Sequence, residues 1–246
     1  MRTAAILPVK RFAQAKQRLG ASVADPLRKE LARAMVGDVL DALGDTGSIQ
    51  STIVVTREDS VATAARALGA LTVEDTAEAS QSAAVSLGVA RALADGFERV
   101  LCVPGDCPAL DPAELDALLH GSTCEVVIVP DRHGTGTNGL LLAPPDAIPP
   151  SFGPGSRERH TALALGAGIA ARIEQPPSLL LDIDTGEDLA VLRDRLSGER
   201  IIGASRTRAA LGLPASPFPA SPLPASPLPA SPLTANSPAC SATTAV

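Results

Sequence analysis

The sequence predicts an α/β protein built on a doubly wound, mainly parallel β-sheet. Short apolar runs bounded by turn residues alternate along the chain with longer segments of helical period. Several runs are apolar throughout, as in strands that are buried on both faces of a parallel sheet. The expected strands are 4–9, 51–56, 70–74, 99–104, 124–130, 139–143 and 178–183.

Helices are expected in the intervals between these strands. The clearest one covers 26–43, where Pro26 suits the first turn and apolar residues recur at helical spacing. The full set of expected helices is 26–43, 59–68, 77–95, 112–119, 157–168 and 186–196.

The chain is expected to hold one folded domain, 1–205, and a disordered tail, 214–246. The tail repeats Pro-Ala-Ser-Pro-Leu and has no charged residue. Proline at this density removes backbone donors, and the segment has too little apolar variety to form a core. A partner that recognises proline is the alternative to a tail without a function.

Charge and composition exclude several classes of function. The net charge of −6 lies on the folded part, whereas nucleic-acid binding requires a basic face. The 4 cysteines and 3 histidines are scattered, so no zinc site is predicted. No signal peptide and no apolar run long enough for a bilayer are evident, so we expect a cytoplasmic protein with no membrane partner.

The first chemical motif follows the first expected strand. Lysine is rare in this chain, yet Lys10 and Lys16 both fall in ILPVKRFAQAKQRL, and Arg18 comes two residues later. Compact positive charges in a loop after a strand suit a polyphosphate. A basic, solvated loop that binds nothing is the alternative.

Two acidic motifs also follow expected strands. In VPGDCPAL, Gly105 and the prolines fix a bend from which Asp106 projects, which suits Mg²⁺; a turn aspartate that bonds its own backbone is the alternative. In LLLDIDTGEDL, Asp182 and Asp184 share one side of a strand, which favours a cation near them. The alternative is a helix cap, since Thr185 with Asp188 resembles a capping box.

Two glycine-rich segments complete the set. PDRHGTGTNGLLL (130–142) can offer backbone N–H groups to an anion, or it can be an ordinary hairpin. In SFGPGSRERH (151–160), Ser156 can cap a helix that starts at Arg157, and that helix terminus can bind an anion. A plain capped helix is the alternative.

In this order, the six motifs resemble the 2-phospho-L-lactate and phosphoenolpyruvate guanylyltransferases of deazaflavin coenzyme F-420 biosynthesis. The resemblance covers about 1–197 and includes LRKELARAMVGDVLDAL beside the segments above. It implies the nucleotide-sugar-transferase fold, which is Rossmann-like, and transfer of GMP from GTP to a small phosphorylated acid with Mg²⁺. It also implies a downstream transferase that accepts the unstable guanylylated product.

The resemblance further implies roles for individual residues. Asp106, Asp182 and Asp184 match the metal-binding acids, and Lys10, Lys16 and Arg18 match the basic residues around the GTP phosphates. The phospho-acid would be held by Thr137 or Asn138, Gly153 and Ser156. Where relatives carry Leu-Asn-Ala, this chain reads Gln81-Ser82-Ala83, so Ser82 offers a shorter hydroxyl to the base or ribose.

Three other functions are compatible with these residues. A glycosyltransferase of similar architecture would use Asp182 and Asp184 as its metal motif, and another nucleotidyltransferase would keep the phosphate machinery. A nucleotide sensor would bind GTP without catalysis, but three acids near one ligand then repel one another. The composition, rich in Ala and Arg, is typical of a high-GC bacterium, and the resemblance implies that the family there uses phosphoenolpyruvate as acceptor; no residue by itself decides between this acid, 2-phospho-L-lactate and 3-phosphoglycerate.

Overall fold

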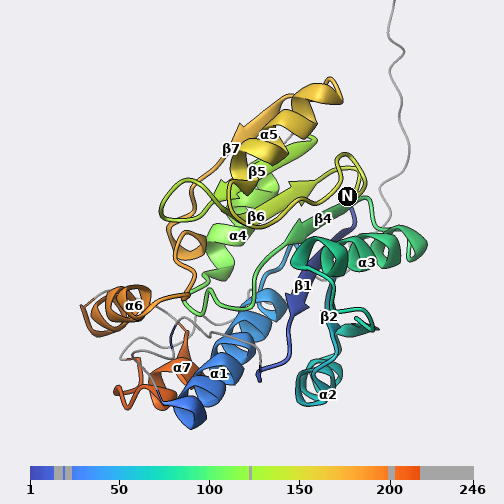
Figure 1. The fold of residues 1–246 in the computed structure, drawn as a ribbon. Coiled ribbons are helices and arrows are strands. Elements are labelled where there is room, and N and C mark those ends of the chain that lie inside the picture. The colour runs from blue at the N-terminus through green and yellow to red at the C-terminus, as the bar shows by residue number, and fades with distance from the viewer. Residues whose placement is uncertain (14–18, 20–23, 122–123, 199–202, 217–246) are drawn as a thin grey trace, which may run out of the picture.

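The computed structural model describes residues 1–13, 19, 24–121, 124–198 and 203–216. In this part of the chain a seven-stranded sheet has the order β3-β2-β1-β4-β6-β5-β7, with helices on both faces (Figure 1). The predicted α/β architecture with a mainly parallel sheet is confirmed. The strands are β1 (Thr3–Val9), β2 (Ser51–Thr56), β3 (Leu71–Glu74), β4 (Arg99–Cys102), β5 (Val126–Pro130), β6 (Thr137–Leu142) and β7 (Ala171–Ile173).

All strand pairs are parallel except those of β6. β1 pairs in parallel with β2 and β4, β2 with β3, and β5 with β7, while β6 is antiparallel to both β4 and β5. The central strands are buried on both faces, as their continuous apolar sequences predict.

The helices form two layers that enclose the sheet. One face packs on α1, α2 and α4, and the other on α3 and α5. A third apolar cluster joins α1 to the C-terminal helices α6 and α7. The helices are α1 (Asp25–Gly44), α2 (Asp59–Ala67), α3 (Gln81–Ala94), α4 (Pro112–Gly121), α5 (Ser156–Gly166), α6 (Gly186–Gly198) and α7 (Ser205–Ala210). No helix in the described ranges has the length and apolar character needed to cross a membrane.

The strand predicted at 178–183 is wrong. Pro176 and Pro177 lack backbone N–H groups, and the chain there forms the 3-10 helix η2 (Pro177–Leu179) followed by a segment without regular structure outside the sheet. Its leucines and isoleucine are buried in the clusters around the sheet and α6 rather than in a strand. The edge strand β7 was not predicted, because it has only 3 residues and is largely exposed.

The helix α7, also not predicted, is attached to α1 by one buried acid. The Asp38 carboxylate accepts hydrogen bonds from the backbone N–H groups of Arg206 (3.0 Å) and Thr207 (2.8 Å). The Arg206 guanidinium also pairs with Asp41 on the same helix. These contacts fix the end of the described chain against α1.

Candidate active site

The predicted site segments meet at one edge of the sheet. β1 and β4 are parallel, so Lys10, directly after β1, and Asp106, in the turn after β4, leave the sheet at the same edge. Because β6 is antiparallel to β4, its first residues, Thr137 and Asn138, lie beyond the carboxyl end of β4. Ligands of doubly wound sheets bind at this edge.

The two acidic segments lie side by side. The backbone N–H of Ile183 donates to the backbone carbonyl of Asp106 at 3.1 Å. Leu181 and Ile183 are buried, whereas Asp182 and Asp184 are only half-buried. Because burial alternates along this segment, the two carboxylates share its outer side although it is not a strand.

Asp182 is the most perturbed acid of this group. Burial raises its pKa to about 6, and the nearby charges of Asp106 and Asp184 add to the increase. A hydrogen bond from the Asn138 amide, 3.2 Å from the Asp182 carboxylate, opposes it. The same amide donates to the Leu179 carbonyl at 3.0 Å, so both Asn138 amide hydrogens are used.

This donor set fits a hard divalent cation. Mutual repulsion of the acids, seen in the raised pKa of Asp182, is relieved when a cation binds between carboxylates. Among the described residues, no three or more His, Cys, Asp or Glu side chains form a group that could hold a metal ion by themselves. Mg²⁺ in proteins takes one or two carboxylates and keeps waters and substrate phosphate oxygens as its other ligands.

The capping box at the start of α6 is present beside these acids. Asp188 accepts hydrogen bonds from the Thr185 backbone N–H (2.7 Å) and hydroxyl (2.8 Å), and its own N–H approaches the Thr185 hydroxyl at 3.3 Å. Arg132 from the glycine-rich loop pairs with Asp188 at 2.7 Å. Thr185 and Asp188 therefore cap the helix, and neither Asp182 nor Asp184 is needed for that purpose.

The two glycine-rich segments contact each other. Asp131 organises the first, because its carboxylate accepts the N–H groups of Thr135 and Gly136, both at 2.9 Å. The Thr135 carbonyl then accepts the N–H of Arg157 in α5 at 3.2 Å. The predicted acceptor residues on β6 and on α5 are thus brought to the same place.

The start of α5 differs from the prediction in one respect. Its N-cap is Gly155, with φ +70°, and Ser156 is the first helical residue rather than the cap. Gly153, at φ +106°, adopts a backbone conformation that favours glycine. Ser156 is 1% exposed, and its hydroxyl has no hydrogen-bond partner within the described ranges. A buried hydroxyl of this kind at a helix N-terminus suits a ligand oxygen.

Sequence reasoning missed His160, one turn further along α5. Its ring is fully buried, lies 3.1 Å from the Thr137 hydroxyl through Nδ1, and accepts the Ser151 N–H at Nε2 (2.8 Å). It thus links the first residue of β6 to the loop before α5. Nothing in the local sequence indicates this role, because the burial of a single histidine leaves no local pattern.

The predicted nucleotide-binding residues are only partly described. Lys10 is exposed at the end of β1, whereas Lys16 and Arg18 lie outside the described residues. Ser82, in the first turn of α3, accepts the backbone N–H of Phe152 at 2.8 Å. Ser82 therefore connects the start of α3 to the loop that precedes α5.

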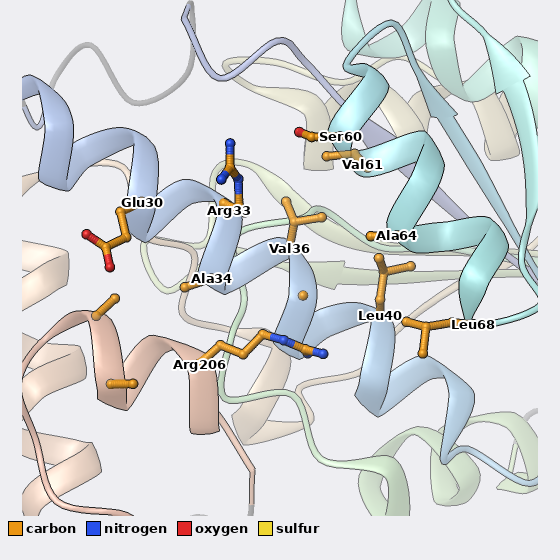
Figure 2. A pocket seen from close by; sticks show the side chains of 13 residues that line it. Glu30, Arg33, Ala34, Val36, Leu40, Ser60, Val61, Ala64, Leu68 and Arg206 are labelled. Atoms are coloured by element: carbon orange, nitrogen blue, oxygen red, sulfur yellow. The ribbon is translucent and has the colours of Figure 1, made fainter.

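A groove lies elsewhere, between α1, α2 and α7. It encloses about 500 Å³, and none of the predicted site residues lines it. The side chains of Leu40 and Leu68 converge in it, and Arg206 reaches into it from α7 (Figure 2). Gly37 makes this path possible, since a Cβ there would be 2.6 Å from the Arg206 side chain. The groove is separate from the acidic edge of the sheet.

Comparison with solved structures gives the class of the fold. The chain aligns over 86% of its length with 95% of a protein from Desulfovibrio desulfuricans G20 assigned to the nucleotide-diphospho-sugar transferases, with a TM-score of 0.65 and 19% identity. It also aligns over 80% of its length with 99% of a CMP:2-keto-3-deoxy-manno-octonic acid synthetase solved with CTP, with a TM-score of 0.55 and 14% identity. At these identities the likeness establishes only that the chain shares the fold of these proteins.

The sequence comparison then gives the family. Residues 3–199 match the family described as "Guanylyl transferase CofC like", and the chain belongs to it. It is 50% identical over 214 residues to the phosphoenolpyruvate guanylyltransferase of Conexibacter woesei, covering 86% of this chain and 96% of that protein. It is 34% identical over 190 residues to the 2-phospho-L-lactate guanylyltransferase of Methanothermobacter thermautotrophicus, covering 77% and 83%. The resemblance inferred from the motifs is confirmed.

Proposed function

We propose that this protein transfers GMP from GTP to the phosphate of phosphoenolpyruvate or 2-phospho-L-lactate, releasing pyrophosphate, as a step of coenzyme F-420 biosynthesis. One observation carries the proposal: in a chain of the guanylyl transferase family, Asp182 lies near Asp106 and Asp184 and bonds to Asn138 of a glycine-rich segment at the carboxyl edge of the sheet. The relative at 50% identity is named for phosphoenolpyruvate, which favours that acceptor.

In this reaction a phosphate oxygen of the acceptor attacks the α-phosphorus of GTP in line. A new P–O–P bond forms, the bond from the α-phosphorus to the bridging β-phosphate oxygen breaks, and pyrophosphate leaves. A phosphate monoester is already ionised near neutral pH, so the protein needs no strong general base. Catalysis then depends on orientation and on neutralisation of charge around the α-phosphate.

Asp106, Asp182 and Asp184 would hold Mg²⁺, and Asn138 would orient Asp182 through its amide. Bound Mg²⁺ supplies positive charge to the phosphate oxygens. Lys10 would approach the leaving pyrophosphate from the end of β1. Lys16 and Arg18 are proposed for the same phosphates on sequence grounds alone.

The acceptor would lie between β6 and α5. Thr137 and Ser156 are proposed to donate hydroxyl hydrogen bonds to its anionic groups, and Gly153 would allow its close approach to the backbone. Both Asn138 amide hydrogens are donated within the protein, so only the Asn138 carbonyl oxygen is left to face the phospho-acid substrate. Ser82 is proposed to lie near the base or ribose.

The test is pyrophosphate release from GTP and Mg²⁺ with phosphoenolpyruvate, 2-phospho-L-lactate or 3-phosphoglycerate supplied one at a time. The F-420 precursor alcohol and the downstream transferase are included to trap the unstable product. Release that requires one acid supports the proposal and identifies the acceptor. No release with any acid, with GTP or with another nucleoside triphosphate, contradicts it.

A further inference from the structure

His160 joins the two segments between which the acceptor is proposed to lie. Its imidazole is 0% exposed, and each ring nitrogen has a partner from a different segment. Nδ1 lies 3.1 Å from the Thr137 hydroxyl at the start of β6, and Nε2 lies 2.8 Å from the Ser151 backbone nitrogen. The Phe152 ring meets the imidazole edge-on at a centroid distance of 5.1 Å.

These partners determine where the imidazole proton is. A backbone N–H can only donate, so Nε2 must carry no hydrogen. Burial, with the charge of Arg159, lowers the pKa of His160 to about 4, so the ring is neutral near neutral pH. The single ring proton is therefore on Nδ1, which donates to the Thr137 oxygen. The hydroxyl hydrogen of Thr137 then remains for a different acceptor.

We propose that His160 is a positioning residue that turns the Thr137 hydroxyl into a hydrogen-bond donor for the anionic acceptor and fixes the 151–155 loop opposite it. This inference rests on the proposed function, because the acceptor must lie between Thr137 and the start of α5. The imidazole does not touch the acceptor in this arrangement. It acts through Thr137 and through the Ser151 backbone.

Other contacts also hold the 151–155 loop, but these contacts do not involve the Thr137 hydroxyl. The Arg159 guanidinium donates to the backbone carbonyls of Ser151 and Phe152, each at 3.0 Å, and Ser82 accepts the Phe152 N–H. The loop therefore keeps several attachments when the His160 ring is replaced. Loss of the imidazole should act on acceptor binding before it acts on the fold.

Two conservative variants separate the two ring nitrogens. In His160→Asn, the side-chain amide N–H can replace Nδ1–H toward Thr137, while in His160→Gln the carbonyl oxygen can replace Nε2 toward Ser151. His160→Phe keeps the ring and removes both bonds. His120→Gln, at an exposed histidine on α4, makes the same chemical change away from the site.

The measurement is KM for phosphoenolpyruvate and for GTP in steady-state pyrophosphate release by the full chain. We expect the acceptor KM to rise about tenfold in His160→Gln and His160→Phe, the factor for loss of one oriented hydrogen bond. It should stay within about threefold of wild type in His160→Asn and in His120→Gln. GTP KM should be unchanged in every variant. In a Thr137→Val background, His160→Gln should have no further effect on the acceptor KM.

An unchanged acceptor KM in both His160→Gln and His160→Phe would overturn the positioning role while leaving the proposed function intact. So would an equal rise in both KM values, which indicates general damage to the site. If the wild-type protein releases no pyrophosphate with phosphoenolpyruvate or 2-phospho-L-lactate, the proposed function fails, and the role of His160 fails with it.

Discussion

Two acids of this chain have raised pKa values for the same primary reason but have different neighbours. Burial raises the pKa of Asp38 on α1 and of Asp182 before α6. Around Asp38 the neighbours are donors: the Thr207 side chain, the N–H groups of Arg206 and Thr207, and the Arg206 charge all lower its pKa. Around Asp182 the neighbours Asp106 and Asp184 raise the pKa further, while a hydrogen bond from the Asn138 side chain and a backbone hydrogen bond lower it.

The difference separates a structural acid from a candidate ligand-binding acid. The protein itself satisfies the Asp38 carboxylate, which anchors α7. Asp182 instead has two neighbouring acids that raise its pKa, an arrangement that suits a cation supplied from solution. Burial raises the pKa of both acids and therefore does not separate their roles, whereas the sign of the neighbouring charges does.

The largest effect is expected from Asp182→Asn. The amide keeps the shape of the side chain but removes a charge proposed to bind Mg²⁺, so kcat/KM should fall by about 10²–10³ or more. The urea midpoint should stay equal or rise, because the repulsion from Asp106 is removed. Asp194→Asn, at an exposed position of α6, is the control. Near-normal turnover of Asp182→Asn would mean that Asp182, like Asp38, has no role in catalysis.

A pH effect on stability of about 3 kcal/mol is expected from His160, given the fall of its pKa from 6.5 to about 4. Between these two pH values the unfolded chain binds a proton on this histidine and the folded protein does not. The free energy of unfolding therefore decreases as pH falls through this range and is unaffected by this group above it.

Urea unfolding of wild type and His160→Asn across that range measures the effect. The wild-type slope should exceed that of the variant by about 1.4 kcal/mol per pH unit. Arg159 is the charged group that contributes to the lowered pKa, beside burial, and it is unchanged in the variant. Equal slopes would show that His160 titrates normally in the folded protein.

Much of the fold followed from local pattern. Strands with continuous apolar sequence, such as β1 and β5, and the long helix α1 have signals within their own residues. The 178–183 segment has the same apolar composition, but its preceding prolines and its packing against α6 keep it out of the sheet. The short strand β7 depends on its partner β5, so its own 3 residues carry almost no signal.

The candidate site could be predicted where the type of a residue by itself indicates its chemistry. Asp106, Asp182 and Asp184 stood out because acids in apolar surroundings require a reason, and the structure brings their segments together. The roles of His160 and Asn138 depend on partners more than 20 residues away in sequence, at Thr137 and Asp182. No local pattern contains such a contact.

Replacement of the structural acid should affect stability and leave activity unchanged. In Asp38→Ala, the N–H groups of Arg206 and Thr207 lose their acceptor, so unfolding should become easier by about 2 kcal/mol. Asp41→Ala removes only a largely exposed ion pair with Arg206 and should cost less than about 1 kcal/mol. Urea midpoints and kcat for both variants test this. A fall in kcat for Asp38→Ala, measured well below its melting temperature, would contradict the structural assignment.

A small effect is also expected at Thr185, which lies close to Asp182 in the sequence. Asp188, six residues after Asp182, has a lowered pKa: burial alone would raise it, but bonds from the Thr185 side chain and backbone, the Asp184 N–H and the Arg132 charge outweigh that effect. Thr185→Ala removes the hydroxyl from this cap and should lower the free energy of unfolding by about 1 kcal/mol. Thr185→Ser keeps the hydroxyl and should behave as wild type. Equal urea midpoints for the two variants would show that the Asp188 cap is held by backbone donors and Arg132 alone.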